Sequence, residues 1–315
     1  MRIGILRHGG QGYAENELLR IGQERGHQIE IINPYTTPLS LGIRPEIDAL
    51  ISRAEISSYA GSDAYFRVLD FYEAWGIPII NGKQATLNAQ DKFRTHALVA
   101  MAGVPTPRTV IYYGTESLKN ICTEETRDFP VVIKKPYGGR GEGVFFFKGR
   151  DDLEEIAGAF SEDEPFLIQE YIPLEKNEQG NFRDIRVWVC RNATTEQPEC
   201  LGGFYRNSNK GSFHTNLCAG GRITKIGSLQ AGISDMAKKS LEAIAADVAG
   251  VDIGLSQDGR IYLIEINISF DSGKEMREAM GILIEERILD LAERRIERQG
   301  EGILMRKNAC QKELI

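Results

Sequence analysis

Two carboxylates and one carboxamide are spaced in this chain so that together they could bind a hard cation. Asp252, Glu265 and Asn267 lie in VDIGLSQDGRIYLIEIN, residues 251–267. The Asp-Gly pair at 258–259 predicts a two-residue hairpin turn, which would place Asp252 opposite Glu265 and Asn267 on the same face. Facing carboxylates repel one another, and oxygen ligands suit Mg²⁺. We therefore predict a metal site. The alternative is a solvated acidic hairpin, which the apolar run around Glu265 disfavours.

The second pattern that could take part in chemistry is a glycine-rich loop that follows a strand ending in lysine. In PVVIKKPYGGRGEGV, residues 130–144, the pair Lys134-Lys135 ends an apolar run, and four glycines fall within 138–143. Glycines let backbone N–H groups approach phosphate oxygens, and lysine adds positive charge. The sequence is not a Walker A loop, since GK[ST] is absent. A phosphate-binding loop and a flexible β-hairpin both remain open on these residues alone.

Two weaker patterns could contact a nucleotide or a transferring phosphate. The apolar run at 166–172 ends in Gln-Glu-Tyr-Ile, where exposed backbone could bind a purine edge; an ordinary strand end is the alternative. Cationic and polar side chains also occur in three separate segments, at Arg186, Arg206 and the pair His214/Asn216. Gathered around a phosphate they would stabilise developing charge, whereas singly each is a surface residue.

Composition sets the class of protein. The 315 residues are 42% apolar and 26% charged, which is typical of a globular chain with room for more than one domain. The net charge of −7 argues against a general nucleic-acid or membrane surface, and no apolar stretch reaches the 18 residues of a membrane span. The five cysteines are dispersed without a CxxC pair, and the chain opens on a strand-like MRIGIL. We therefore expect a cytoplasmic protein without a signal peptide, zinc site or disulfide framework.

The elements that must position these residues begin with a βαβ pattern. We expect strands at 2–6, 27–33, 47–51 and 77–80 with helices between them, and hence a parallel sheet. The first loop, RHGGQGY, has glycines but lacks the GxGxxG dinucleotide fingerprint.

Helices and strands then alternate irregularly. We expect helices at 89–103, 151–160, 228–249 and 278–298, and little order after Gly300. The further strands are expected at 108–113, 130–135, 166–172, 184–190 and 200–206, with a polar loop at 207–222.

In this order the patterns resemble the ATP-grasp superfamily, and within it the RimK-type ligases, which add amino acids to carboxylates. The likeness spans residues 1 to about 300. It is carried by these stretches: RGHQIEIINP, NAQDKFRTHALVAMAGVPTP, PVVIKKPYGGRGEGV, LIQEYI, RDIR, FHTNL followed by AGG, VAGVDIG and EIN.

The resemblance implies an α/β fold of the α+β ATP-grasp type. An N-terminal Rossmann-like parallel-sheet domain at 1–88 would precede an ATP-grasp domain at 89–300. That domain would have a central lobe at about 89–172 and a C-terminal lobe at about 173–300, followed by a tail at 301–315.

The resemblance also implies roles by position. The residues implied to contact ATP are Lys92, Lys134, Gly139, Arg140, Gly141, Gly143, Glu170, Tyr171, Ile172, Asp184, His214 and Asn216. The implied ligands of Mg²⁺, or of Mn²⁺ in its place, are Asp252, Glu265 and Asn267, and the implied catalytic cations are Arg186 and Arg206. Strand alternation sends Lys134 and Lys135 to opposite faces, and we favour Lys134.

The implied reaction activates a substrate carboxylate as an acyl phosphate, which an amine, such as that of an amino acid, then attacks. The carboxylate could belong to a small molecule, a peptide or a protein. In place of the family's small-residue and Pro-Gly-Leu segment after EIN, this chain has ISFDSGKEMREAMG, so its acceptor is not implied.

A ligase of free amino acids or a peptide-capping enzyme is the runner-up. The other classes are an ATP-binding protein without ligase activity and a nicotinamide oxidoreductase. No nucleic-acid or membrane partner is expected, and a homo-oligomer is left open.

Overall fold

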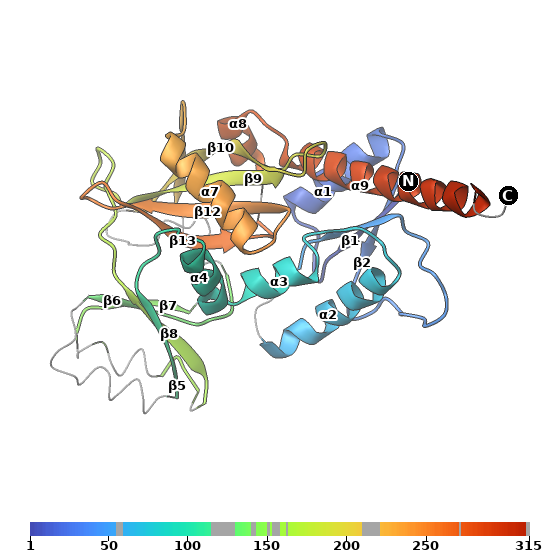
Figure 1. Cartoon of the computed structure of the whole chain (residues 1–315). Helices are drawn as coiled ribbons and strands as arrows, with labels where there is room; N and C mark the ends of the chain where they lie inside the picture. The colour runs from blue at the N-terminus through green and yellow to red at the C-terminus, as the bar shows by residue number, and fades with distance from the viewer. Residues whose placement is uncertain are drawn as a thin grey trace.

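The structure is a computed structural model. It describes residues 1–54, 59–114, 130–139, 143–149, 152, 158–161, 163–209, 221–270 and 272–312. The described strands form three sheets, which meet around two short helices near the middle of the molecule (Figure 1). The expected helix at 151–160 lies largely outside the described residues.

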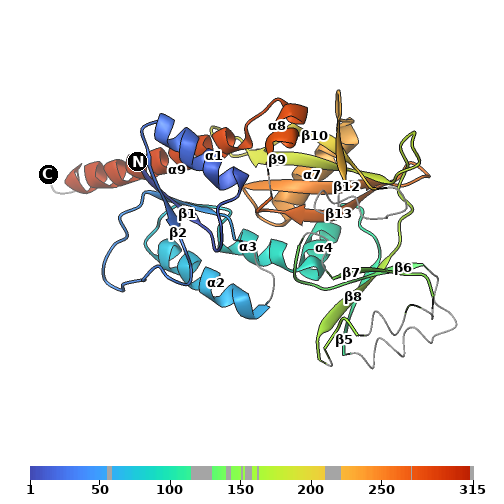
Figure 2. The same cartoon turned by 180° about the vertical axis from the view of Figure 1, so that it is seen from behind.

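A four-stranded sheet is built from the start of the chain, and all its strands are parallel, as predicted. In spatial order they are β2 (Gln28–Ile32), β1 (Arg2–Leu6), β3 (Ala49–Ser52) and β4 (Ile79–Ile80). Helices α1 (Tyr13–Glu24) and α9 (Ile284–Lys312) lie on one side of it, and α2 (Tyr59–Ala74) lies on the other (Figures 1 and 2). Burial on both faces explains why β1 and β3 are continuous apolar runs.

The middle of the chain forms two short helices and an antiparallel sheet. The sheet consists of β5 (Thr109–Tyr113), β8 (Pro165–Glu170), β6 (Val131–Lys134) and β7 (Val144–Phe147), in that spatial order. The helices are α3 (Lys83–Gln90) and α4 (Lys92–Met101), where one helix was expected at 89–103. Extended Asp91 separates them, and its carboxylate accepts from the first N–H groups of α4, which makes it an N-cap rather than a helical residue.

The third sheet is antiparallel and carries most of the candidate site. Its spatial order is β11 (Arg222–Lys225), β10 (Pro198–Asn207), β9 (Arg183–Arg191), β12 (Val248–Leu255) and β13 (Ile261–Asn267). Helix α7 (Ala231–Ala243) packs on one face, against alternate residues such as Val187 and Val251. The expected helix at 228–249 is wrong at its end, because the chain turns at Ala245, with φ of 56°, and enters β12.

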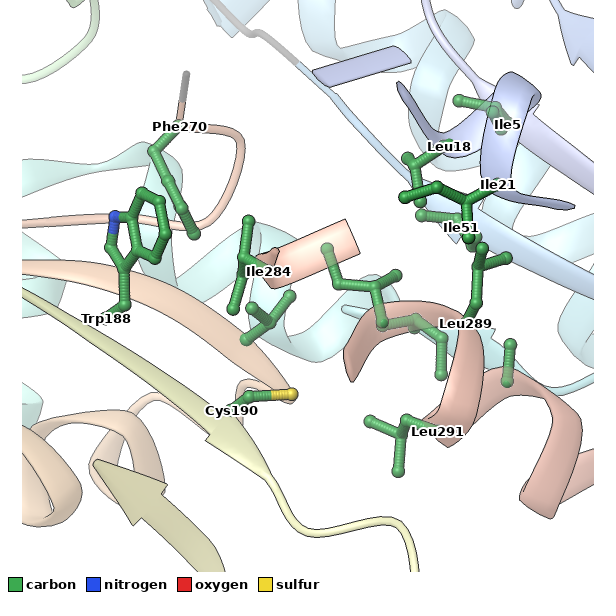
Figure 3. Packing of buried hydrophobic residues seen from close by; sticks show 14 of the residues in the cluster. Ile5, Leu18, Ile21, Ile51, Trp188, Cys190, Phe270, Ile284, Leu289 and Leu291 are labelled. Carbon is green, nitrogen blue, oxygen red and sulfur yellow. The ribbon is translucent and has the colours of Figure 1, made fainter. Parts of the chain in front are cut away.

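One apolar cluster joins the first sheet to the third. It includes Ile5 of β1, Leu18 of α1, Leu289 of α9 and Trp188 of β9 (Figure 3). Each fully buried side chain of this kind contributes on the order of 1.5–3 kcal/mol. Apolar burial therefore fixes the position of the parallel sheet against the sheet that bears the acidic hairpin.

The C-terminal segment differs from expectation at both ends. Gly281, with φ of 66°, ends α8 (Lys274–Met280), so the helix expected at 278–298 is split there. Helix α9 then continues past Gly300 to Lys312, where little order was expected. Within the described part of the chain, no helix combines the length and apolar character needed to cross a membrane.

Candidate active site

The hairpin of β12 and β13 has a longer turn than expected. Next to the turn Leu255 pairs with Ile261, and the N–H of Ser256 donates to the carbonyl of Arg260 at 2.8 Å. Three residues therefore form the loop, with Gly259 in the left-handed region at φ of 80°. The prediction of a two-residue turn is wrong.

A β-bulge restores the expected pairing further along the hairpin. The register shifts by one residue at Ile264, so Asp252 lies opposite Glu265, as predicted, and Gly250 lies opposite Asn267. Without this extra residue, Asp252 would face Ile264 and Glu265 would point to the face covered by α7, since a one-residue slip turns every side chain over. The bulge is thus what gathers the acidic and amide groups.

Asp252 is fully buried and is held by two arginines. Arg186 donates from Nε and Nη2 to its two oxygens, both at 2.7 Å. Arg206 Nη2 lies 2.9 Å from Asp252 Oδ2 and also donates, with Nε, to both oxygens of Asp184 at 2.6 and 2.8 Å. Asn267 Nδ2 donates to the same Oδ2 at 3.4 Å. Burial opposes ionisation of Asp252, but the arginines outweigh it and lower its pKa.

The strand that carries Arg206 is one residue longer at its end than expected, and the Arg206 side chain is largely buried although it lines the cavity described below. β10 continues through Asn207, and only 4% of the Arg206 side chain is exposed. Burial disfavours its charge, but Asp184 and Asp252 outweigh burial and raise its pKa. The guanidinium therefore joins two buried carboxylates.

Two lysines from different elements face the acidic hairpin. Lys92, the first residue of α4, donates Nζ to the carbonyl of Gly138 at 2.5 Å and lies 4.0 Å from Oε1 of Glu265. Lys134 donates Nζ to Gln169 Oε1 at 2.6 Å. Burial lowers the pKa of Lys134 to about 8; Glu265 opposes this shift and Lys92 adds to it.

Lys135, the residue after β6, contacts a different set of residues from Lys134, as strand alternation predicts. Its Nζ contacts Glu164 at 2.9 Å and lies 5.2 Å from the ring centroid of Phe160. Its contacts are thus with Glu164 and the ring of Phe160 rather than with the residues around Lys134.

Gln169 and His96 are neighbours of Lys134 that the sequence did not single out. Gln169 Nε2 lies 3.3 Å from His96 Nε2 and donates to Thr109 Oγ1 at 2.9 Å. Burial, and then Lys134, lower the pKa of His96 to about 3, so this imidazole is neutral at pH 7. Strand alternation places Gln169 on the Lys134 face, but only the packing of α4 brings His96 there.

The remaining predicted contacts are spread more widely. Glu170 is exposed and accepts from the N–H of Arg108 at 3.2 Å. Tyr171 packs on Phe146 with ring centroids 4.7 Å apart, and Ile172 is 8% exposed. None of Glu170, Tyr171 and Ile172 is among the described residues that line the cavity below.

The glycine loop is described only at its edges. Gly139 lines the cavity, and Gly143 closes the loop with φ of 69°. Arg140 and Gly141 lie outside the described residues, as do His214 and Asn216.

Some of these residues, but not Lys134 or Gln169, line a cavity of about 470 Å³ that extends to the parallel sheet. Lys92, His96, Arg186, Arg206, Glu265 and Asn267 line one part of it. Arg7, Tyr13, Glu15, Arg53, Phe270 and Met276 line another. Sequence reasoning missed Arg7, which directly follows the strand predicted at 2–6, and Arg53, which directly follows the observed strand β3. The cavity therefore combines candidate phosphate and metal ligands with residues from the edge of the parallel sheet, from α1 and from the segment after β13.

Two of the three predicted metal ligands, Glu265 and Asn267, are placed to bind a hard cation in the cavity, and Asp252 is not. Glu265 is 28% exposed, and it lines the cavity together with Asn267, whose amide oxygen is a suitable ligand. Asp252 does not line the cavity, and its oxygens accept from arginines. Among the described residues, no group of three or more His, Cys, Asp and Glu side chains could hold a metal ion.

Comparisons with known proteins agree on one family. Residues 89–292, more than half of the chain, match the sequence model of the RimK-like ATP-grasp domain. The probable alpha-L-glutamate ligase of Klebsiella pneumoniae is 31% identical over 286 residues, which cover 85% of this chain and 88% of that protein. The coenzyme gamma-F420-2:alpha-L-glutamate ligase of Methanococcus maripaludis is 28% identical over 245 residues, which cover 77% and 81%.

A solved structure shares the fold at low sequence identity. The ATP-grasp ligase PsnB, complexed with a phosphomimetic variant of a minimal precursor, Mg and ADP, gives a TM-score of 0.67 at 17% identity. The match covers 93% of this chain and 98% of that one.

Proposed function

This chain belongs to the RimK-like ATP-grasp family, and we propose that it is an ATP-dependent ligase that joins a carboxylate to an amine. The observation that carries the proposal is the convergence of Lys92, Glu265 and Asn267 on one cavity. These residues come from two separate elements, and a β-bulge is needed to bring Glu265 to this face.

The proposed chemistry needs positioning more than a protein nucleophile. A carboxylate oxygen of the first substrate attacks the γ-phosphorus of ATP, the bond to the bridging oxygen breaks, and ADP leaves. The amine then attacks the carbonyl carbon of the acyl phosphate, loses a proton, and expels inorganic phosphate. Cations that surround the phosphoryl group stabilise its charge during transfer. Lys92 and Lys134 are the proposed contacts to the nucleotide, with the Gly138–Gly143 loop over its phosphates.

Magnesium is the proposed metal, with manganese as an alternative. Glu265 and Asn267 would hold it through oxygens that face the cavity, and it would neutralise phosphate charge. Asp252, predicted as a third ligand, would have to release an arginine to coordinate an ion directly. In the arrangement described, it instead orients Asn267 and fixes Arg186 and Arg206.

The amine substrate is proposed to be an amino acid. The Klebsiella and Methanococcus relatives are named as glutamate ligases, and PsnB was solved with a precursor, Mg and ADP. The segment after Asn267 departs from the family pattern, so a ligase of free amino acids and a peptide-capping enzyme remain alternatives.

The proposed location is the cytoplasm. Cys190 and Cys200 are free thiols, which supports a reducing compartment.

A screen of carboxylate and amine pairs tests the proposal. The full chain is incubated with ATP and Mg²⁺, released phosphate is measured, and products are weighed by mass spectrometry. We expect phosphate release that depends on both substrates and a product lighter by one water than their sum. ATP binding without such release from any pair would favour a nucleotide-binding protein without ligase activity.

A further inference from the structure

We propose that Asn81 is a positioning residue for the metal site. Its carboxamide closes the end of the β12–β13 hairpin at which Asn267 lies, and so holds Asn267 in place to bind Mg²⁺. The inference rests on the proposed function, because it assigns a further residue to the same site. The register of the hairpin, the hydrogen bonds of Asn81 and its backbone conformation support this role.

Asn267 lies at the open end of the hairpin. It is the last residue of β13, and its pair with Gly250 is the last pair of the β12–β13 ladder. In the described sheet β13 is also an edge strand, so only β12 supports it. The ends of such ladders open more readily than their middles. A metal ligand in this position therefore gains from support outside the hairpin.

The Asn81 carboxamide bridges the two strands beyond that last pair. Its Nδ2 donates to the carbonyls of Val248 and Ile268, at 2.9 and 3.1 Å. Its Oδ1 accepts from the N–H groups of Asp247 and Val248, at 2.8 and 3.1 Å. These bonds use both donors and both lone pairs of the carboxamide. The side chain thus takes the place of one further ladder pair, directly next to Asn267.

Asn81 comes from the parallel sheet, so it gives the hairpin a fixed point outside its own sheet. It directly follows β4 and is 1% exposed. Its own N–H donates to Asp247 Oδ2 at 2.7 Å. Its φ of 58° lies in the left-handed region, which asparagine adopts more readily than most residues. Because a buried carboxamide is costly to leave partly unpaired, this orientation is strongly favoured.

A neighbouring strand end of the same sheet holds the same segment. Arg53, which directly follows β3, donates Nη2 to the carbonyl of Phe270 at 2.8 Å. Asn81 and Arg53 follow adjacent strands, and the carbonyls that they contact lie two residues apart along the chain. The carboxyl edge of the parallel sheet therefore holds the chain directly after Asn267, in the segment that departs from the family pattern.

The expected consequence is a change in metal binding rather than in nucleotide binding. Groups that hold a metal ligand in place typically contribute about 10- to 100-fold to metal affinity. Asn81 is not among the described residues that line the cavity, so it would act only through the hairpin. Loss of its carboxamide should weaken the response to Mg²⁺ and leave the affinity for the nucleotide alone unchanged.

Calorimetric binding of ADP to the full chain tests this without turnover. We would measure the dissociation constant of ADP without metal and at saturating Mg²⁺, and thermal unfolding would check each variant. In the wild type, Mg²⁺ should tighten ADP binding. In Asn81→Gly and in Asn81→Asp the metal-free constant should stay the same, and the factor by which Mg²⁺ tightens binding should be about 10-fold smaller.

The two variants remove the same hydrogen bonds in different ways. Glycine adopts a φ of 58° without strain but has no side chain. Aspartate keeps the shape and the acceptor oxygen but cannot donate to the carbonyls of Val248 and Ile268. Agreement between the variants therefore separates the lost hydrogen bonds from altered packing and from added negative charge.

Arg295→Gln is the matched control for lost stability. Arg295 of α9 donates Nη2 to Asp247 Oδ1 at 2.6 Å and to Glu196 Oε2 at 2.9 Å. Its loss should weaken the same junction without removing a bond to Ile268. The control should therefore unfold at a lower temperature than the wild type, as the Asn81 variants should, but should keep the wild-type response to Mg²⁺.

Three results overturn the inference: a wild-type Mg²⁺ response in either Asn81 variant, an equally weakened response in Arg295→Gln, or loss of folding in both Asn81 variants, which would make Asn81 a residue of the fold alone. ADP binding that does not depend on Mg²⁺ in the wild type would reject the proposed metal site, and the inference with it. An Asn81-dependent Mg²⁺ response together with a negative phosphate screen would keep the positioning role and reject the ligase.

Discussion

At the scale of single residues, Asp252 was predicted to be a metal ligand, and in the structure it binds two arginines. The sequence identifies it as a metal ligand because it faces Glu265, and that pairing is confirmed. The structure adds Arg186 and Arg206, which lie far along the chain and take up its oxygens. No local pattern around position 252 could have indicated those partners. The cavity-facing ligands are therefore expected to be Glu265 and Asn267.

Glu265→Gln should remove turnover while leaving the fold intact. The change keeps size and hydrogen bonding but loses one charged oxygen from the proposed Mg²⁺ site, so kcat should fall by about 10²–10³. Phosphate release at saturating ATP and Mg²⁺ measures it, and thermal unfolding checks the fold. The matched control is Glu175→Gln, a carboxylate of similar exposure (27%) that pairs with Arg183. Near-normal kcat in Glu265→Gln would remove Glu265 from the site.

Arg206→Lys should weaken both stability and turnover. Lysine keeps the charge but cannot join the buried carboxylates of Asp184 and Asp252 as the guanidinium does. We expect the free energy of unfolding to fall by on the order of 3 kcal/mol, together with a large loss of kcat. Urea unfolding and phosphate release measure the two effects. Arg183→Lys, which alters a partly exposed pair with Glu175, should change both only slightly. A wild-type unfolding midpoint in Arg206→Lys would argue against the buried network.

At the scale of elements, most strands follow directly from their apolar runs, and two of the errors occur where a distant partner strand decides the boundary. The short strand β11 was not predicted: it begins at the last residue of the polar loop expected at 207–222, and it forms by pairing with β10 rather than by burying apolar residues. The end of α7 depends on the pairing of Val248 with Cys190 of β9. Periodicity in one segment contains no information on such pairings.

In the candidate site, too, some residues carry a local sequence signal and others are brought together only by packing. The hairpin and the glycine loop carry local signals, so their residues could be named from the sequence. The contact of His96 with Gln169 and the grouping of Arg7, Glu15 and Arg53 depend on how α4 and the parallel sheet pack. The bulge at Ile264 has no evident signal in its own residue type.

The packing of α4 against the small sheet should make stability depend on His96 in acid. Its pKa is lowered from an ordinary 6.5 to about 3 in the folded chain, so the unfolded chain takes up the proton first. Its contribution is therefore present above about pH 6.5 and is lost as pH falls toward 3, with a slope of at most about 1.4 kcal/mol per pH unit.

Urea unfolding between pH 7 and pH 4 measures this dependence. His96→Asn should be less stable at pH 7 and should lose less stability on acidification than the wild type. Parallel curves for the two proteins would show that His96 takes up its proton equally in the folded and unfolded chains.

At the scale of the whole molecule, the cavity depends on the fixed placement of two sheets. The apolar cluster that includes Leu18, Leu289 and Trp188 holds the parallel sheet against the sheet that carries Glu265 (Figure 3). Fold and family together indicate an ATP-grasp ligase, and the chemistry proposed for it is an acyl phosphate formed in that cavity. The residues that line the cavity range from Arg7 to Met276, so distant parts of the chain border the same space.

Isotope tracing tests this chemistry most directly, using whichever carboxylate and amine give phosphate release. The substrate carboxylate is labelled with ¹⁸O, and the products are analysed by mass spectrometry after a single turnover. The account predicts ADP, and one ¹⁸O in the released phosphate, because a carboxylate oxygen forms the bond to phosphorus and leaves with it. Released phosphate without ¹⁸O, or formation of AMP and pyrophosphate with the label in AMP, would contradict it.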